Sequence, residues 1–467
     1  MADEICWLDA TELAARIRAK ELSPLEVTRA HLERIARLNP SLNAVVTLAL
    51  DPEARARAAE SALMRGGPLG PLHGVPFTVK DSFETAGLRT TCGSRLLADH
   101  VPTADATVVT RCLDAGGIML GKTNTPEFTL WAETSNLVLG RTVNPWNADR
   151  TSGGSSGGEA AAIAAGLSPL GVGSDVGGSI RVPAHYCGIV GLKPTHGRVP
   201  LTGHLPATLT RFLHAGPMAR TVRDVALGLQ VLAGPDGRDW SASPMPAFVA
   251  TDPPPAGQLR VGWMAERGFS VVHPEVVNAV TRAADSLRAA GAVVEPVSIP
   301  GLEQHDWNAL SIILFGAEAG PYFDALIAGR HEQLHPLLRR RLGARIDALA
   351  DYIRVENEVD ALRRDLMDHF RRHDILLCPT GTLLAHPHDA TEHVIAGQTV
   401  PARHALRATV PFDLTGSPAL SVPFGVSSDG LPIGVQLVGR ACEEGRVLQV
   451  GALLEAASQL RERPPVG

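Results

Sequence analysis

The sequence lacks the paired cysteines and the long apolar run that mark several classes of protein. Its six cysteines include no C-x-x-C pair, which argues against a disulfide framework and against a zinc site. No run of about 18 apolar residues occurs, so we expect no membrane span. The acidic start, Met1 to Trp7, lacks the basic and apolar regions of a signal peptide. These absences predict a cytoplasmic enzyme.

Basic residues are not concentrated anywhere in the chain. It has 43 Lys and Arg against 49 Asp and Glu, a net charge of −6, and its longest basic run is Arg339 to Arg341. We expect no nucleic-acid partner, because phosphate binding needs a concentrated cationic face. The 467 residues, 45% hydrophobic, contain no internal repeat and no long linker. They therefore favour a single globular domain over residues 1–467.

Helical and strand patterns alternate along much of the sequence. Helices are predicted after caps at Asp9 and Ser23, the second ending near Asn39-Pro40, and over 52–65, 104–115, 158–166, 274–290 and most of 302–373. Strands are predicted over 74–80, 118–120, 170–174, 259–264, 291–297, 374–378, 419–422 and 433–438. Residues 234–258 are rich in Pro, Asp and Ser, which predicts an irregular segment that crosses the protein surface. The alternation favours an α/β sheet over separate all-α and all-β domains.

Glycine and serine are crowded into two short stretches, residues 152–158 and 173–181. Glycine loses more conformational entropy on folding than any other residue, so this density needs a reason. One reason is a pair of tight turns with serines as local caps. The other is a backbone that approaches a reacting group and directs several N–H donors at one point, as an oxyanion requires.

A serine in these stretches needs a base before it can attack an amide. His185 and His196 are nearest in sequence, but neither has a spacing that identifies it as the base. Lys80 ends an apolar strand, and burial would lower its pKa from about 10.4 towards about 7–8, where a lysine is a competent base. An exposed lysine at the end of a strand is the alternative, and the residues alone leave both open.

Three patterns suggest other chemistry. Gly116 to Thr123 matches the phosphate-loop expression, but a helix precedes it and Ile118 to Leu120 is an apolar strand, so we expect no nucleotide. Gly153-x-Ser155-x-Gly157 matches a nucleophile elbow, but the residues before it are turn-like. His386, His388 and His393 could suggest a metal, whereas Pro387 favours a solvated turn, so we expect neither metal nor cofactor.

Taken together, several motifs resemble the amidase signature family of hydrolases. They are Gly74–Asp81, Gly121–Asn124, Asn144–Trp146, Gly153–Gly158, Asp175–Arg181, Gly188–Thr195, Gly216–Arg220 and, more weakly, Leu431–Gln436. The resemblance covers essentially the whole chain. It implies an α/β fold, a single large domain with a mixed, central twisted β-sheet covered by helices on both faces. It also implies a catalytic core over 70–200 and, over 302–373, a helical segment that forms part of a lid.

The resemblance also implies the roles of individual residues. It implies a triad of Ser179 as nucleophile, Ser155 as bridging serine and Lys80 as base, with a cis bond between Gly154 and Ser155. The backbone N–H groups of Val176, Gly177, Gly178 and Ser179 would form the oxyanion hole. Asp175 and Arg181 would brace this loop, Ser156 would be a nearby donor, and Thr129, Leu130 and Trp131 would line the substrate pocket.

The activity implied is cleavage of the C–N bond of small apolar or aryl carboxamides through an acyl-enzyme on Ser179. Esters and carbamates are chemically open to the same attack. The alternative is the glutaminase-like A subunit of a glutamyl-tRNA amidotransferase, from whose usual pattern Glu159, Val176 and Arg198 to Pro206 depart. A binding protein with a dead site is disfavoured because all three triad positions are intact. The expected partner is a small-molecule substrate, and a homodimer is left open.

Overall fold

The computed structural model describes residues 2–246, 259–343, 348–460 and 462–466, so part of the predicted surface crossing lies outside the described residues. The N-terminal helices begin where the sequence places capping side chains. Asp9 accepts the Glu12 N–H at 2.8 Å as α2 (Ala10–Arg18) begins, and the Ser23 hydroxyl caps α3 (Pro24–Leu42). α4 (Pro52–Arg65) has the predicted bounds. The predicted end of α3 was wrong: Leu42 is buried in an apolar cluster, and this packing extends the helix past Pro40.

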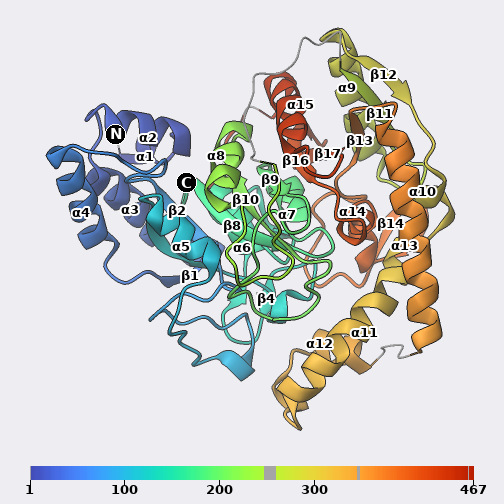
Figure 1. Cartoon of the computed structure of the whole chain (residues 1–467), viewed down its shortest axis with the longest axis horizontal. Coiled ribbons are helices and arrows are strands. Elements are labelled where there is room, and N and C mark those ends of the chain that lie inside the picture. Colours follow the sequence, from blue (N-terminus) through green and yellow to red (C-terminus); the bar gives the residue numbers. More distant parts are fainter. Residues whose placement is uncertain (1, 247–258, 344–347, 461, 467) are drawn as a thin grey trace.

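The central sheet has eleven strands in the order β1-β3-β2-β8-β10-β9-β16-β17-β13-β11-β12 and contains both parallel and antiparallel neighbours. Its strands are β1 (Val45–Leu48), β2 (Pro76–Lys80), β3 (Ile118–Thr123), β8 (Leu170–Asp175), β9 (Val190–Lys193), β10 (His214–Ala219), β11 (Arg260–Trp263), β12 (Val293–Pro296), β13 (Ile375–Pro379), β16 (Ala419–Val426) and β17 (Pro432–Gly439). The mixed sheet between layers of helices confirms the predicted fold class (Figure 1).

The remaining described strands form three small hairpins: β4 (Ser135–Asn136) with β5 (Gly140–Arg141), β6 (Val143–Asn144) with β7 (Asn147–Thr151), and β14 (Glu392–Ile395) with β15 (Gln398–Pro401). The segment before Gly153, predicted to be turn-like, is the β6–β7 hairpin. Because β7 pairs with β6 and lies outside the central sheet, it does not supply the strand that a nucleophile elbow requires.

Helices cover both faces of the sheet. α8 (Val222–Leu232), α9 (Pro274–Ala289) and α15 (Glu444–Ala457) contact one face, and α6 (Gly157–Ala164) and α7 (Arg181–Cys187) contact the other. The other described helices are α1 (Ala2–Ile5), α5 (Thr107–Asp114), α10 (Pro300–Gln304), α11 (Trp307–Ile327), α12 (Pro336–Gly343), α13 (Leu349–Phe370) and α14 (Val410–Leu414). Figure 1 shows α11 and α12 extending from the end of the molecule that carries α13.

Glycines on one face of the sheet let α6 and α7 approach it closely. A Cβ atom on Gly171 would lie 1.9 Å from the Glu159 carboxylate of α6, and one on Gly191 would lie 2.8 Å from Ile180. Glycine at these positions leaves room for the Glu159 carboxylate, which Thr78 and Thr123 hold by hydrogen bonds, and for the Ile180 side chain. Part of the glycine density in the sequence therefore has a packing cause.

α11 meets the length and composition of a membrane span, with a mean hydropathy of 1.4, which the sequence analysis did not anticipate. In the structure this helix packs against α12, α13 and α14. Its Glu318 carboxylate accepts hydrogen bonds from Arg211 at 3.0 Å and from Tyr352 at 2.9 Å. These contacts are those of a helix packed within the fold.

Candidate active site

Two neighbouring parallel strands bring the predicted base to one end of the sheet. β2 and β8 are paired with Val79 opposite Val172, so Lys80 at the end of β2 lies beside the end of β8. Lys80 and Ser174 are both buried there, and the Lys80 Nζ lies 3.0 Å from the Ser174 Oγ and 3.4 Å from its carbonyl oxygen. The register of the sheet thus decides which side chains Lys80 can reach.

Ser155 lies just before α6 and faces the same lysine. Its Oγ is 2.7 Å from the Lys80 Nζ, and the Gly154–Ser155 peptide bond is cis. Glu159, on the first turn of α6, accepts hydrogen bonds from Thr78 of β2 and from Thr123 of β3, the latter at 2.7 Å. These bonds fix the start of the helix against the strand that carries Lys80.

The surroundings of Lys80 favour its neutral form. Burial lowers the pKa of Lys80 to about 7, although the nearby Cys92, Asp175 and Glu159 act in the opposite direction. Removal from water disfavours the charged ammonium, and none of these groups forms an ion pair with it within the described part of the chain. A neutral lysine is the state that can accept a proton.

His204 determines the direction of the hydrogen bonds around Lys80. Its Nδ1 lies 3.4 Å from the Pro206 carbonyl oxygen, which can only accept, so the proton of this neutral ring is on Nδ1. Its Nε2, 2.9 Å from the Ser174 Oγ, must then accept the Ser174 hydroxyl proton. The Ser174 Oγ can then accept a hydrogen bond from the Lys80 amine. The lone pair of the neutral amine can in turn accept the hydrogen bond that the Ser155 hydroxyl donates.

Ser179 lies in the loop between β8 and α7, and hydrogen bonds hold this loop in place. The Ser156 N–H donates to the Ser179 carbonyl at 3.1 Å, and the Ser156 hydroxyl donates to the Ser174 carbonyl at 3.3 Å. The Gly178 N–H donates to Asp175 at 2.5 Å, and the Thr409 hydroxyl donates to the Gly177 carbonyl at 2.7 Å. The peptide unit between Gly177 and Gly178 is thus bound at both of its polar groups.

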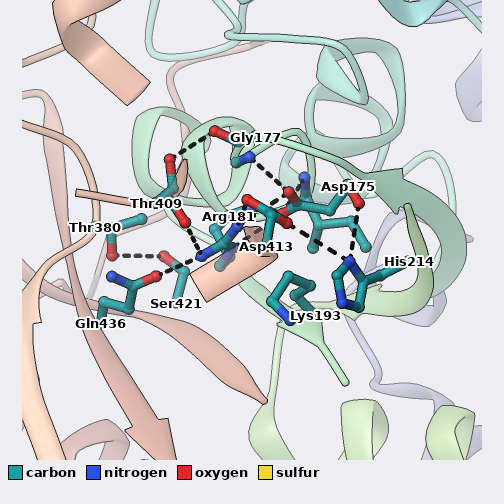
Figure 2. Close-up of polar contacts among 12 residues, drawn as sticks. Asp175, Gly177, Arg181, Lys193, His214, Thr380, Thr409, Asp413, Ser421 and Gln436 are labelled. Atoms are coloured by element: carbon teal, nitrogen blue, oxygen red, sulfur yellow. Dashed lines mark hydrogen bonds and ion pairs between the residues drawn. The ribbon is translucent and has the colours of Figure 1, made fainter. Parts of the chain in front are cut away.

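The buried guanidinium of Arg181 joins this loop to the C-terminal strands (Figure 2). It pairs with Asp175 at 3.0 Å and with Asp413 at 2.6 Å, and it donates to the Gln436 side chain at 2.9 Å. Burial acts to raise the pKa of Asp175, but Arg181 and the hydrogen bonds hold that pKa below its ordinary value. Burial raises the pKa of Asp413 well above its ordinary value. A buried ion pair between Arg181 and Asp175 therefore lies behind the Ser179 loop.

The family model for Amidase matches residues 26–448. The chain belongs to the amidase family. It is 38% identical over 476 residues to the A subunit of a glutamyl-tRNA(Gln) amidotransferase from Roseiflexus sp. (strain RS-1), with 95% of each chain covered. It is 34% identical over 493 residues to an acylamidase of Rhodococcus erythropolis, covering 98% of this chain and 97% of that one. A solved bacterial aryl acylamidase of the amidase signature family is 29% identical, with a TM-score of 0.85 over 97% of this chain and 96% of that one.

Membership in the amidase family makes the chain a hydrolase of amide bonds and confirms the resemblance found in the sequence. Sequence reasoning nevertheless missed four residues around the site: Ser174, His204, Asp413 and Gln436. Ser174 ends the predicted strand 170–174, just as Lys80 ends the predicted strand 74–80. This shared position at a strand end was a signal that could have identified Ser174. His204 and Asp413 reach the site only through the tertiary fold, whereas Gln436 ends the weakly matching motif Leu431–Gln436, which gave no role for its side chain.

The other candidate residues have structural partners. The His185 Nε2 lies 2.9 Å from the Leu383 carbonyl and the His196 Nε2 lies 2.7 Å from the Thr210 carbonyl, so neither histidine of this amidase is placed beside a site serine. The phosphate-loop match is the buried strand β3. Pro387 and Asp389 are exposed and His388 lies in a turn, as predicted, but His386 is buried and its ring is tilted against that of His393, with the centroids 4.2 Å apart. Among the described residues, no group of three His, Cys, Asp or Glu side chains could hold a metal ion.

The predicted pocket residues lie beside the site. Leu130 and Trp131 line a cavity of about 450 Å³, together with residues of α12 and of the chain after β15. Thr129 is buried and does not line this cavity. A Cβ on Gly154 would lie 2.7 Å from the Trp131 carbonyl oxygen, so the cavity wall directly contacts the residue before Ser155.

Proposed function

We propose that this amidase hydrolyses small carboxamides through an acyl-enzyme on Ser179, with Ser155 and Lys80 as its proton path. The observation that carries the proposal is a buried lysine with a pKa of about 7, whose Nζ lies 2.7 Å from the Ser155 Oγ. At neutral pH a substantial fraction of a lysine with such a pKa is in the neutral form that can accept a proton, and it is still basic enough to take one from a hydroxyl group. The transfer between the hydroxyls of Ser179 and Ser155 is the step that the proposal adds to this geometry.

In the proposed reaction, Lys80 takes the Ser155 proton while Ser155 takes the Ser179 proton, and the Ser179 Oγ attacks the carbonyl carbon. The Gly178 N–H is already bound to Asp175, so the N–H groups of Val176, Gly177 and Ser179 are left to stabilise the oxyanion. The C–N bond then breaks, and the proton returns through Ser155 to the leaving amine. Water, deprotonated along the same path, attacks the acyl-enzyme and releases the acid.

The test combines three variants with direct detection of the acyl-enzyme. Ser179→Ala and Lys80→Met should each lower kcat by at least about a hundredfold, because each removes a group that the chemical step requires. Lys122→Met is the matched control, since Lys122 is also fully buried, on the adjacent strand, but donates to Thr85 and Phe83. Mass spectrometry of enzyme quenched during turnover should find the acyl group on Ser179. Turnover by Ser179→Ala at the wild-type rate would reject the mechanism.

For the substrate we propose an amide with an apolar or aryl acyl group, and esters and carbamates as further substrates. The apolar lining by Leu130, Trp131, Leu337 and Leu338 supports this choice, as do the acylamidase and aryl acylamidase relatives. Residues 302–373 would then contribute the outer wall as a lid, and 70–200 the catalytic core. A cytoplasmic location and the absence of a nucleic-acid partner are part of the same proposal.

A second candidate is glutaminase activity of the amidotransferase A-subunit type. The 38% identity to such a subunit over 95% of both chains favours it. Glu159 and Val176, where those subunits usually carry serine and threonine, support the free amidase instead. A panel of aryl and alkyl amides, esters and carbamates separates the two when glutamine, with and without charged tRNA, is included. Hydrolysis confined to glutamine would favour the second candidate.

A further inference from the structure

The cavity beside the site is lined by arginines as well as by apolar side chains. Leu130 and Trp131 form one wall, and Leu337, Leu338 and Arg341 of α12 form another. Arg403 lines it from the 3₁₀ helix η5 (Ala402–Leu406). A volume of about 450 Å³ is within the usual range for small-molecule sites.

The wall that carries Arg403 extends to the Ser179 loop, and the wall that carries Arg341 extends to the residue before Ser155. Arg403 is three residues before Leu406, and in a 3₁₀ helix such side chains lie on the same face. The Leu406 side chain would lie 3.9 Å from a Cβ on Gly177, in the predicted oxyanion loop. Arg341 donates to the carbonyl of Leu130, one residue before the Trp131 carbonyl that lies against Gly154. Lys80, Ser155 and Ser179 do not line the cavity themselves, but its walls continue to Gly154 and Gly177, which lie within two residues of the two serines in the chain.

The acidic side chains of the cavity already have partners. Glu127 accepts from the Ser94 hydroxyl at 2.7 Å and from the His335 N–H at 2.6 Å. Glu133 contacts His388 at 3.2 Å, and Asp389 pairs with Arg141 at 2.5 Å. Within the described residues, none of these three carboxylates forms an ion pair with Arg341 or Arg403.

Arg341 and Arg403 have no carboxylate within ion-pair distance in the part of the chain that the structure describes. Arg341 lies over the Trp131 ring at 5.3 Å, and Arg403 donates to the Ser311 hydroxyl at 2.8 Å while its Nε has no partner. Burial lowers the pKa of Arg341 to about 10, and burial together with the charge of Arg341 lowers that of Arg403 to about 9, although Asp306, which pairs with Arg407, acts in the opposite direction. Two half-buried guanidinium groups that line one cavity without an ion-pair partner among the described residues favour a bound anion.

We infer that Arg341 and Arg403 bind a carboxylate of the substrate, so that the preferred substrate is a small amide with a second, anionic end. Guanidinium groups match carboxylates through paired N–H donors, and the apolar wall would hold the carbon chain between the two ends. This inference rests on the proposed function, whose substrate class it makes specific.

The activity test uses two substrates that differ only in charge: glutaric acid mono-p-nitroanilide and its methyl ester. Wild type should hydrolyse the acid with a kcat/KM at least about tenfold above that of the ester, mainly through KM. Arg341→Met and Arg403→Met should each lower kcat/KM for the acid far more than for the ester, so that the preference falls at least about tenfold. Arg339→Met is the control, because Arg339 is exposed on α12 and lies outside the cavity. It removes the same charge and should keep the preference for the acid. Equal kcat/KM for acid and ester in wild type would overturn the inference.

A binding measurement separates this inference from the proposed function. Calorimetry of glutarate with the Ser179→Ala variant should detect binding that Arg403→Met weakens at least about tenfold and Arg339→Met does not. Glutarate binding without hydrolysis of any amide would leave the inference standing and reject the proposed function. Hydrolysis without glutarate binding, or binding that survives both cavity substitutions, would reject the inference and leave the proposed function standing.

Discussion

At the scale of single residues, Lys80 gives the site a defined pH dependence. Its pKa is lowered to about 7, and only the deprotonated amine can take the Ser155 proton. As pH falls below about 7, protonation should therefore lower kcat/KM tenfold per pH unit, and above it the rate should reach a plateau. A pH–rate profile of an uncharged amide measures this directly. A rise centred near the ordinary lysine value, 10.5, would mean that Lys80 is not the buried base described.

His204 is expected to act on catalysis through Ser174. His204→Phe leaves the Ser174 proton without its acceptor, so the hydroxyl can donate to the Lys80 lone pair and compete with Ser155. We expect kcat to fall at least about tenfold with little change in KM. His204→Gln, which offers an acceptor oxygen, should restore part of the rate.

A double-mutant cycle distinguishes this role from a structural one. In a Ser174→Ala background the competing hydroxyl is gone, so His204→Phe should cause little further loss of kcat. Equal losses in both backgrounds would show that His204 only supports the packing against Phe83, whose ring centroid lies 5.0 Å away.

At the scale of elements, the loop between β8 and α7 depends on one of its two adjacent glycines. Gly178 has a φ of +122°, and a Cβ there would lie 2.3 Å from the Thr409 hydroxyl oxygen. At Gly177 the nearest atom to a Cβ is 3.6 Å away, an ordinary contact. Gly178→Ala should lower the free energy of unfolding by about 1–3 kcal/mol, whereas Gly177→Ala should change it little. Chemical denaturation of both variants tests the difference, and equal effects would contradict it.

Much of the element order could be predicted from the sequence, because caps and apolar periods act locally. Asp9, Ser23 and the Pro52 start all mark helices that the structure contains. β10 was not predicted, because its Gly216 and Pro217 are typical of turns. In the structure its ladder to β9 includes only Met218 and Ala219, so the absent N–H of Pro217 costs no bond on that side.

At the scale of the whole molecule, Arg181 links the site to the far end of the chain. It pairs with Asp413 and Gln436, which are 232 and 255 residues away. Arg181→Leu should lower the free energy of unfolding by about 3–5 kcal/mol, because it leaves Asp175 charged and buried without its partner. Arg354→Leu, which removes an exposed pair with Asp351, is the control and should have little effect. Similar denaturation midpoints for both variants would contradict the prediction.

The same contacts explain why some residues of the site could not be predicted from the sequence. Local motifs identified Lys80 and Ser155, and the structure places these two side chains 2.7 Å apart. Asp413 and His204 have no motif of their own, since they reach the site only through sheet order and loop packing. The role of the two cavity arginines could not be predicted either, because their lack of a carboxylate partner among the described residues is a property of the folded surroundings.

The Arg181–Asp413 link also bears on the protein during its synthesis. A ribosome that has translated only the first 400 codons has already made Lys80, Ser155 and Ser179, but not the carboxylate that completes the brace behind them. An incomplete chain would thus carry every reacting group and still lack Asp413 and Gln436, which hold the Arg181 guanidinium from its far side. Hydrolysis would then begin only after the C-terminal segment has been made and has packed against the loop.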